Sequence, residues 1–219
     1  MRIKFLSFVT IVSIVMMIGS YVPIFIATGF DYPVGAPDGT GYNTNLGCLW
    51  LQTTKTCGPL HPGLDFNENG NYYADQDFDN PVYAVANGFV VYSDYAEGYY
   101  WGNIIMIEHF LPDGTKVWSQ YGHINRRYVR SGSFVHKGQL IGTMGKGYMS
   151  RFYTHLHFEI RIKEFPAGSW TNGWTKDKIL SYYVNPVEFI DSHRKISYSF
   201  SKKIKKYIGS LIWRSNEEK

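Results

Sequence analysis

The sequence predicts an all-β protein: an antiparallel β-sheet domain, either a sandwich or an open barrel with a groove, plus an N-terminal hydrophobic helix and a short C-terminal helix. Three observations predict this class. Short β-prone runs follow one another from residue 81, turn signals separate them, and the sequence between residues 61 and 165 has no long amphipathic helix pattern. The runs are VYAVANGFVVYS, NIIMIEHF, KVWSQYGHI, QLIGTM and THLHFEIRI, and the turn signals are Asn87-Gly88, Pro112-Asp113-Gly114 and Lys137-Gly138.

Residues 1–30 differ in character from the rest of the chain. Arg2 and Lys4 precede an uncharged, largely apolar run from Phe5 to Phe30, which is typical of a signal peptide or a retained signal anchor. The run is long enough to span a bilayer, which takes about 20 apolar residues. Ser20 offers a weak cleavage position, so both options stay open. In either case we expect an exported protein of the periplasm or cell envelope, anchored in the membrane if the segment is retained.

Residues 31–60 are rich in Gly, Pro, Asn, Thr and Asp, which predicts an irregular segment draped over the domain. This segment contains both cysteines of the chain, Cys48 and Cys57, with eight residues between them. Outside the cytoplasm such a pair can form a disulfide that closes a small loop. Two free thiols are the alternative, and the spacing is too wide for a zinc knuckle.

The net charge of +4 is unevenly distributed. Residues 191–219 hold eight Lys or Arg and three Asp or Glu, whereas residues 31–190 hold 12 and 15. The mildly acidic central part gives no support to nucleic-acid binding. In the basic tail an apolar stripe at helical spacing predicts an amphipathic helix suited to an anionic membrane surface. A helix packed on its own domain or a disordered tail are the alternatives. The stripe consists of Phe200, Ile204, Tyr207, Ile208 and Leu211.

Two short histidine motifs carry the chemistry. In His61-Pro62-Gly63-Leu64-Asp65, the Pro-Gly pair opposes a helix, so we expect a bend that lets His61 and Asp65 converge. In THLHFEI, His155 and His157 lie two residues apart in a strand and share one face. Imidazole nitrogen and carboxylate oxygen are good zinc donors, and a catalytic zinc site uses three protein ligands. Four candidates mean that one of them can serve catalysis instead.

Over residues 61–190 the sequence resembles the lysostaphin-type (LytM-type) zinc metallopeptidases, which cut peptides of the bacterial cell wall. The resemblance rests on the order and spacing of several motifs: HPGLDF, NPVYAVANGFVVY, GNIIMIEH, YGHI, GSFVHKGQLIGTMG, THLHFEIR and NPVEFI. We therefore expect a metallopeptidase domain over residues 61–190, followed by the basic tail 191–219. Within it, residues 166–184 look like a surface excursion, after which Asn185–Ile190 closes the domain.

The resemblance implies roles for five residues. His61, Asp65 and His157 are implied as the Zn²⁺ ligands, whereas His155 and His123 are implied to act in catalysis. The implied reaction is endopeptidase hydrolysis of peptidoglycan cross-links by a zinc-activated water, with a histidine near neutral pKa moving the proton. Which histidine is the base stays open. The remaining histidines, His109, His136 and His193, are interpreted as structural, and Glu159 as a partner of His157 rather than a catalytic group.

Three other interpretations have some support in the sequence. Asp65-Phe66-Asn67-Glu68-Asn69-Gly70 begins like a calcium loop, but its twelfth position is Gln76 instead of Glu and no flanking helices are predicted. The stretch VRSGSFVHKGQLIG resembles biotinyl or lipoyl carrier modules, which lack the histidine set. A non-catalytic family member acting as an activator or scaffold for other cell-wall hydrolases is the alternative function. Such members usually lose ligands, whereas this chain keeps all five positions.

Overall fold

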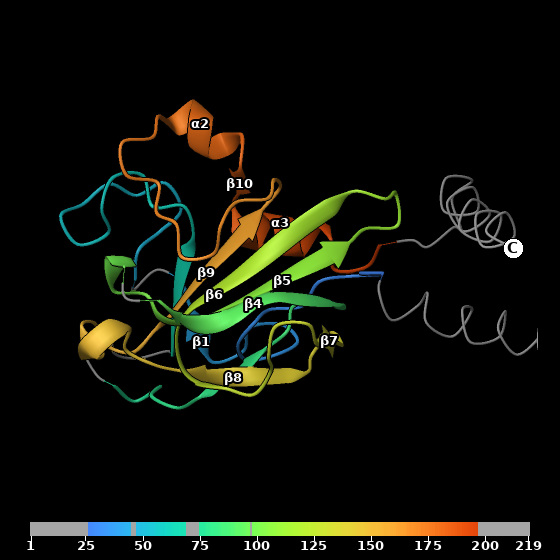
Figure 1. Ribbon diagram of the computed structural model, residues 1–219, viewed down its shortest axis with the longest axis horizontal. Helices are drawn as coiled ribbons and strands as arrows, with labels where there is room; N and C mark the ends of the chain where they lie inside the picture. Colours follow the sequence, from blue (N-terminus) through green and yellow to red (C-terminus); the bar gives the residue numbers. More distant parts are fainter. Residues whose placement is uncertain (1–25, 45–46, 69–74, 97, 197–219) are drawn as a thin grey trace, which may run out of the picture.

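The computed structural model describes residues 26–44, 47–68, 75–96 and 98–196 (Figure 1). The N-terminal apolar segment up to residue 25 and the stripe of the basic tail lie outside these residues, and so do the two helices expected there. The described part is mostly antiparallel β-sheet with few helices, and the sheet is open rather than closed into a barrel. The predicted class, an antiparallel β-sheet domain, is therefore confirmed.

The strands are short except for three in the middle of the sheet. Their bounds are β1 Tyr42–Asn43, β2 Leu64–Glu68, β3 Pro81–Tyr83, β4 Gly88–Ala96, β5 Gly102–Phe110, β6 Lys116–Arg127, β7 Phe134–Val135, β8 Leu140–Met144, β9 Leu156–Arg161 and β10 Tyr183–Val184. Two 3-10 turns, η1 Gly98–Tyr100 and η2 Tyr148–Ser150, and two helices, α2 Lys176–Leu180 and α3 Pro186–Ser192, complete the described elements.

Strand β6 organises the sheet because it pairs with three neighbours. The main path runs β1-β2-β9-β6-β5-β4-β7 (Figure 1). The first half of β6, through Gly122, pairs with β9, whereas its end, Ile124 to Arg127, pairs with β8. His123 lies at the change of partner and has a left-handed φ of 59°. A non-glycine residue in this region is uncommon, and such residues gather at functional sites.

The core lies on the inner side of this curved sheet and reaches beyond the predicted domain limits. It is built from alternate residues of the strands, such as Ile105 and Ile107 of β5 and Phe158 and Ile160 of β9. Ala27 and Phe30, from the end of the apolar N-terminal segment, are also fully buried in it. Residues 26–30 therefore pack as part of the folded domain.

The surface excursion after β9 contains the short helix α2 and the two-residue strand β10, which pairs with β9. The segment NPVEFI then forms helix α3. Asn185 caps this helix by accepting hydrogen bonds from the backbone N–H groups of Val187 and Glu188, and Pro186 occupies its first turn. Asn as N-cap and Pro in the first turn are strong helix-start signals, so this helix was predictable.

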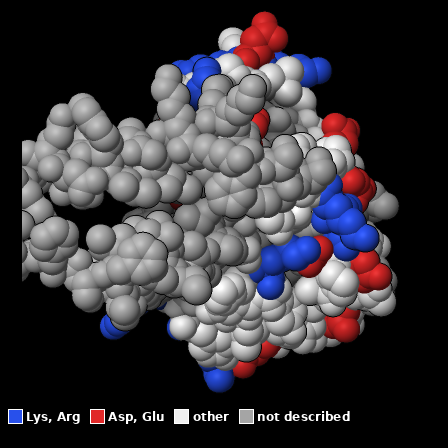
Figure 2. All heavy atoms as spheres, turned by 90° about the vertical axis from the view of Figure 1, so that its right-hand side faces the viewer, with Lys and Arg blue, Asp and Glu red and all other residues white. Residues whose placement is uncertain are grey.

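The described surface mixes charges of both signs. On the face seen in Figure 2, Lys and Arg side chains lie among Asp and Glu side chains wherever described residues are visible. Lys116 and Glu108 form one such ion pair on the sheet, with 3.1 Å between Nζ and Oε2. None of the helices among the described residues is both long enough and apolar enough to cross a membrane.

Candidate metal centre and active site

The pairing of β2 with β9 brings the two histidine motifs together. Asp65 and His157 are directly opposite each other in this antiparallel pair, with Leu64 opposite Phe158 and Phe66 opposite Leu156. Directly opposed side chains lie on the same face of the sheet, within contact distance. His61 precedes β2 in the bend formed by Pro62 and Gly63, as the sequence predicts. Chain segments about 90 residues apart thus supply one site.

The three predicted metal ligands present one donor atom each to a common point. His61 Nε2 lies 3.0 Å from His157 Nδ1, which lies 3.2 Å from Asp65 Oδ1, and Asp65 Oδ1 lies 3.6 Å from His61 Nε2. With zinc–donor bonds near 2.0–2.1 Å and tetrahedral angles, donor atoms of one zinc ion stand about 3.3 Å apart. The observed separations scatter around that value, so the donor set fits a zinc ion.

Hydrogen bonds on the far side of each imidazole set which nitrogen is free to bind a metal. His61 Nδ1 lies 2.9 Å from the carbonyl oxygen of Gly63, and His157 Nε2 lies 2.9 Å from Oε1 of Glu159. Both partners are acceptors, so these nitrogens carry protons, and His61 Nε2 and His157 Nδ1 are the nitrogens that face Asp65 Oδ1. Such outer partners are what orient metal-bound histidines. The contact with Glu159 agrees with its interpretation as a partner of His157.

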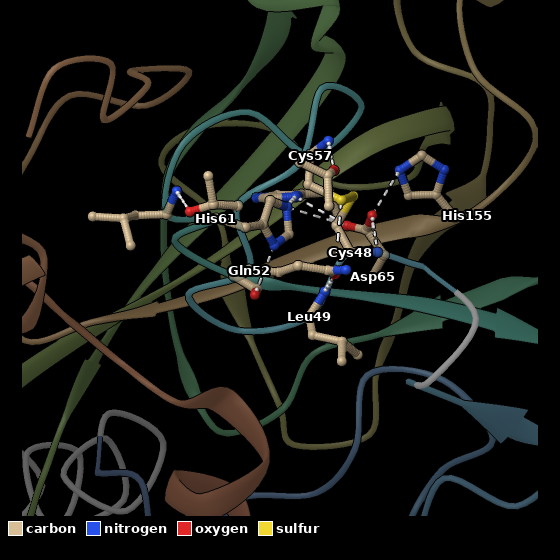
Figure 3. The surroundings of a disulfide bond; sticks show 12 residues. Cys48, Leu49, Gln52, Cys57, His61, Asp65 and His155 are labelled. Carbon is tan, nitrogen blue, oxygen red and sulfur yellow. Dashed lines mark hydrogen bonds and ion pairs between the residues drawn. A yellow bond between two sulfur atoms is a disulfide. The ribbon is translucent and has the colours of Figure 1, made fainter.

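The two oxygens of Asp65 have different surroundings (Figure 3). Oδ1 faces His61 and His157, whereas Oδ2 accepts a hydrogen bond of 3.0 Å from the backbone N–H of Cys48 and lies 3.7 Å from His155 Nε2. Burial alone would raise the pKa of Asp65, but the surrounding histidines hold the pKa well below its usual range. Asp65 is therefore a carboxylate, the form that binds a metal.

Cys48 and Cys57 form a disulfide that borders this site, so of the two alternatives left open by the sequence, the disulfide is the one observed (Figure 3). Cys48, His61 and Asp65 each offer a donor atom within 4.8 Å of the others, a separation that permits a shared metal ion. The sulfur of Cys48 is bonded to Cys57, however, and only a thiolate is a good zinc ligand. Cys48 therefore contributes its backbone N–H to Asp65, and the further donor atom close to both His61 and Asp65 is Nδ1 of His157.

The two histidines expected to act in catalysis stand beside the metal ligands. The ring centroids of His123 and His155 are 4.7 Å apart, and both side chains are buried. His123 Nδ1 lies 3.0 Å from the carbonyl oxygen of Trp101, and His155 Nδ1 lies 2.9 Å from that of Tyr153. Each ring donates through Nδ1, so each Nε2 can accept a proton. Burial and the neighbouring His155 and His157 hold the pKa of His123 well below its usual value.

Aromatic residues that the sequence analysis did not single out form the walls of the site. The ring of Trp101 stacks on His123 at 5.8 Å and meets His157 edge-on at 5.0 Å. Trp170, from the surface excursion, contacts the rings of His61 at 5.7 Å and His157 at 5.8 Å. Trp101 immediately precedes β5 and Trp170 lies in a loop, so neither strand periodicity nor a motif pointed to them.

The remaining histidines have the structural surroundings expected of them. His109 is fully buried in β5, and its ring nitrogens lie 2.9 Å from the carbonyl oxygen of Asn87 and 2.8 Å from Oγ of Ser119. His136 is exposed at the turn before β8, and His193 ends α3, stacked on Phe189. The calcium-loop pattern falls partly on residues 69–74, outside the described part of the chain, while its first residue, Asp65, lies among the histidines.

Comparison with known proteins agrees with this geometry. The profile of Peptidase family M23 matches residues 60–169, half of the chain. Lipoprotein NlpD of Yersinia enterocolitica is 43% identical over 83 residues, which cover 38% of this chain and 78% of that protein. Peptidoglycan DD-endopeptidase ShyC of Vibrio cholerae is 29% identical over 128 residues, 54% of this chain but only 28% of that protein.

Among solved structures, the solution structure of lysostaphin, an antimicrobial peptidase from Staphylococcus simulans, has a TM-score of 0.51 at 23% identity. The match covers 75% of this chain and 55% of lysostaphin, and it shows a shared fold. The profile match spans the bend with His61 and Asp65 and the strand with His155 and His157. The chain therefore belongs to peptidase family M23.

Proposed function

We propose that this protein is a zinc-dependent endopeptidase that hydrolyses peptide cross-links of bacterial peptidoglycan. The observation that carries the proposal is the convergence of three donor atoms, from His61, Asp65 and His157, beside two histidines with proton-accepting Nε2 atoms. Membership of peptidase family M23 and the similarity to a peptidoglycan DD-endopeptidase support the same reaction and substrate. Non-catalytic family members usually lose one or more of these residues, whereas this chain keeps all five side chains together.

The three ligands would hold the zinc ion through His61 Nε2, Asp65 Oδ1 and His157 Nδ1. When bound, zinc supplies a Lewis acid that makes water nucleophilic near neutral pH and polarises the scissile carbonyl. Three protein ligands would leave room at a bound zinc ion for water or substrate, as in other catalytic zinc sites. The contacts of His61 with Gly63 and of His157 with Glu159 hold the two rings in the orientation that directs His61 Nε2 and His157 Nδ1 toward the proposed metal position.

We assign proton transfer to His155. Its Nε2 is a free acceptor and lies 3.7 Å from Asp65 Oδ2, so the carboxylate favours the positive charge that appears on the ring when it takes the proton of the attacking water. His155 then returns the proton to the leaving amine. His123, held neutral by burial, would accept a hydrogen bond at Nε2 from the other O–H of the water, which keeps its hydrogen, and would so orient the water.

The test is hydrolysis of purified peptidoglycan by the chain from residue 26 onward, with mass spectrometry of the released fragments. We expect wild type to release peptide ends in a zinc-dependent way. His155→Ala should retain zinc and lose about 10²–10⁴-fold in kcat, the usual contribution of a general base. The exposed His136→Ala variant serves as control and should behave as wild type. If wild type binds zinc but releases no peptide ends, the activator or scaffold alternative replaces this proposal.

We also propose that the protein acts at the cell envelope. The names of its relatives, a lipoprotein and a peptidoglycan endopeptidase, support this location. The basic, then apolar, N-terminal segment supports export, with either cleavage or retention as an anchor. Fractionation of cells that produce the full chain, followed by N-terminal sequencing, separates these outcomes: an uncleaved chain in the membrane fraction indicates an anchor.

A further inference from the structure

Behind His157 lies an ion pair that the proposed mechanism does not use. Glu159 and Arg161 are both fully buried. Oε2 of Glu159 accepts a hydrogen bond of 2.8 Å from Nε of Arg161, and Nη2 of Arg161 also lies 2.8 Å from Oε2. Charged residues are almost never fully buried unless they are paired. Both stand on β9, on the same face as His157, because they follow it by two and four residues.

The carboxylate of Glu159 divides its two oxygens between the metal centre and the arginine. Oε1 accepts from His157 Nε2 at 2.9 Å, whereas Oε2 accepts from Arg161 and, at 3.3 Å, from Gln120 Nε2. A carboxylate bound on one side only could rotate about its terminal bond. The planar guanidinium of Arg161 and the amide of Gln120 fix this rotation, so Oε1 stays directed at His157.

The same arginine also holds a loop of the surface excursion. Arg161 Nη1 donates to the carbonyl oxygens of Phe165 at 2.7 Å and Pro166 at 3.1 Å. Gln120 Oε1 accepts from Arg161 Nη2 at 2.8 Å and from the backbone N–H of Gly168 at 3.0 Å. Residues 165–168 are therefore held at three backbone positions, two by Arg161 and one by Gln120.

The held loop leads directly to a wall of the active site. Trp170 follows Gly168 by two residues, and its ring contacts those of His61 and His157. The pair thus touches the metal ligand on one side and the base of the Trp170 loop on the other.

From this network we infer that Glu159 and Arg161 are positioning residues of the proposed enzyme: Glu159 fixes the tautomer and orientation of His157, and Arg161 fixes Glu159 together with the loop that carries Trp170. The inference rests on the proposed function, since it assigns how one proposed ligand is oriented. It goes further in placing the loop and the ligand in a single hydrogen-bonded unit. Neither residue touches the reacting atoms.

The experiment measures zinc affinity by competition with a chromophoric chelator, with apo-protein melting and peptidoglycan hydrolysis as separate readouts. Glu159→Gln keeps the shape of the side chain but removes the charge that binds Arg161. Loss of an outer partner of a zinc ligand typically weakens affinity about 10–100-fold, which is the expected result. Arg161→Lys keeps the charge but cannot reach all its acceptors, and should weaken zinc binding less while making residues 165–170 easier to cleave by protease. Glu108→Gln, a carboxylate paired with Lys116, is the matched control.

A double variant separates positioning from stability. Glu159→Met with Arg161→Met leaves no unpaired buried charge, so the fold can recover, yet it offers His157 Nε2 no acceptor. If positioning is the role, zinc affinity stays weakened in the double variant. Wild-type affinity in Glu159→Gln, or affinity restored in the double variant, overturns the inference. If Glu159→Gln does not fold, the zinc affinity of Arg161→Lys serves as the test. An unchanged zinc affinity in Arg161→Lys also overturns the inference. A wild type that binds zinc but hydrolyses nothing defeats the proposed function and leaves this zinc-affinity test in force.

Discussion

His61 Nε2 and His157 Nδ1 lie 3.0 Å apart while the other nitrogen of each ring is engaged with an acceptor, the carbonyl oxygen of Gly63 or the carboxylate of Glu159. Burial alone would lower the pKa of His157, but its contacts with Asp65 and Glu159 raise that pKa to about 9, so without a metal the ring also carries a proton on Nδ1, beside Asp65. A metal ion bound between His61, Asp65 and His157 would take the place of that proton. We therefore expect metal binding to release a proton and to weaken as the pH falls.

Asp65→Asn tests this arrangement. The substitution keeps the size of the side chain but removes the negative charge that faces His61 and His157, the two proposed histidine ligands. We expect zinc affinity to fall by more than the roughly 10–100-fold typical of losing an outer partner, because a direct ligand is lost. Peptidoglycan hydrolysis should fall with it. Equilibrium dialysis followed by metal analysis gives the affinity.

Asp94→Asn provides the comparison for that experiment, since Asp94 is a largely exposed carboxylate on β4. It should bind zinc as wild type does. Equal zinc affinity in Asp65→Asn and wild type would remove Asp65 from the ligand set.

Much of the site could be predicted because its parts are local patterns. Alternation in THLHFEI placed His155 and His157 on one face, and both indeed approach Asp65. The Pro-Gly bend likewise placed His61 near Asp65. What alternation cannot supply is register: the opposition of Asp65 and His157 depends on how β2 aligns with β9, two strands about 90 residues apart.

Other features depend on tertiary contacts that leave no local signal. His123 reaches the site because β6 changes partner there and the residue takes a left-handed φ, which no propensity favours for histidine in a strand. Trp170 and the backbone N–H of Cys48 come from irregular segments. Glu159 was predictable as a neighbour of His157, but its pairing with Arg161 and the loop required the fold.

Reduction or removal of the disulfide should affect both stability and the metal centre. Cys48→Ser with Cys57→Ser opens a ten-residue loop, for which the chain-entropy estimate is about 2.5–3 kcal/mol of unfolding free energy. The backbone N–H of Cys48 also becomes less fixed, which loosens its hydrogen bond to Asp65 Oδ2. We expect urea denaturation to show the stability loss and chelator competition to show weaker zinc binding. Unchanged zinc binding despite the stability loss would show that the disulfide does not support Asp65.

Gly122→Ala should damage catalysis more than zinc binding. A Cβ at Gly122 would lie 2.8 Å from Cζ3 and 2.9 Å from Cε3 of Trp101, so the indole must move. Trp101 stacks on His123 and its carbonyl oxygen binds His123 Nδ1, so His123 moves with it. Overpacking costs about 1–3 kcal/mol of stability, and a misplacement near 1 Å can cost about 100-fold in rate. Trp101 also meets His157 edge-on, so we expect this loss in kcat together with a smaller loss of zinc affinity.

Gly98→Ala is the matched control, because a Cβ at Gly98 meets nothing within 4 Å. It should have wild-type kcat. If Gly122→Ala is as active as Gly98→Ala, Trp101 does not hold His123 in a working position.

Acid should destabilise the fold through His109, which is remote from the proposed metal ligands. Burial lowers the pKa of His109 to about 4, against 6.5 for an exposed histidine. Between these values the unfolded chain binds a proton that the folded protein does not, so unfolding free energy falls as pH drops from about 6.5 to 4. The difference of about 2.5 pH units corresponds to about 3 kcal/mol. Urea unfolding at pH 7 and pH 4.5, with a chelator present to exclude metal binding, measures the loss.

His109→Gln should be less stable at pH 7, since it disturbs the contacts with Asn87 and Ser119, yet lose less stability on acidification. An equally steep loss in that variant would assign the acid sensitivity to other groups.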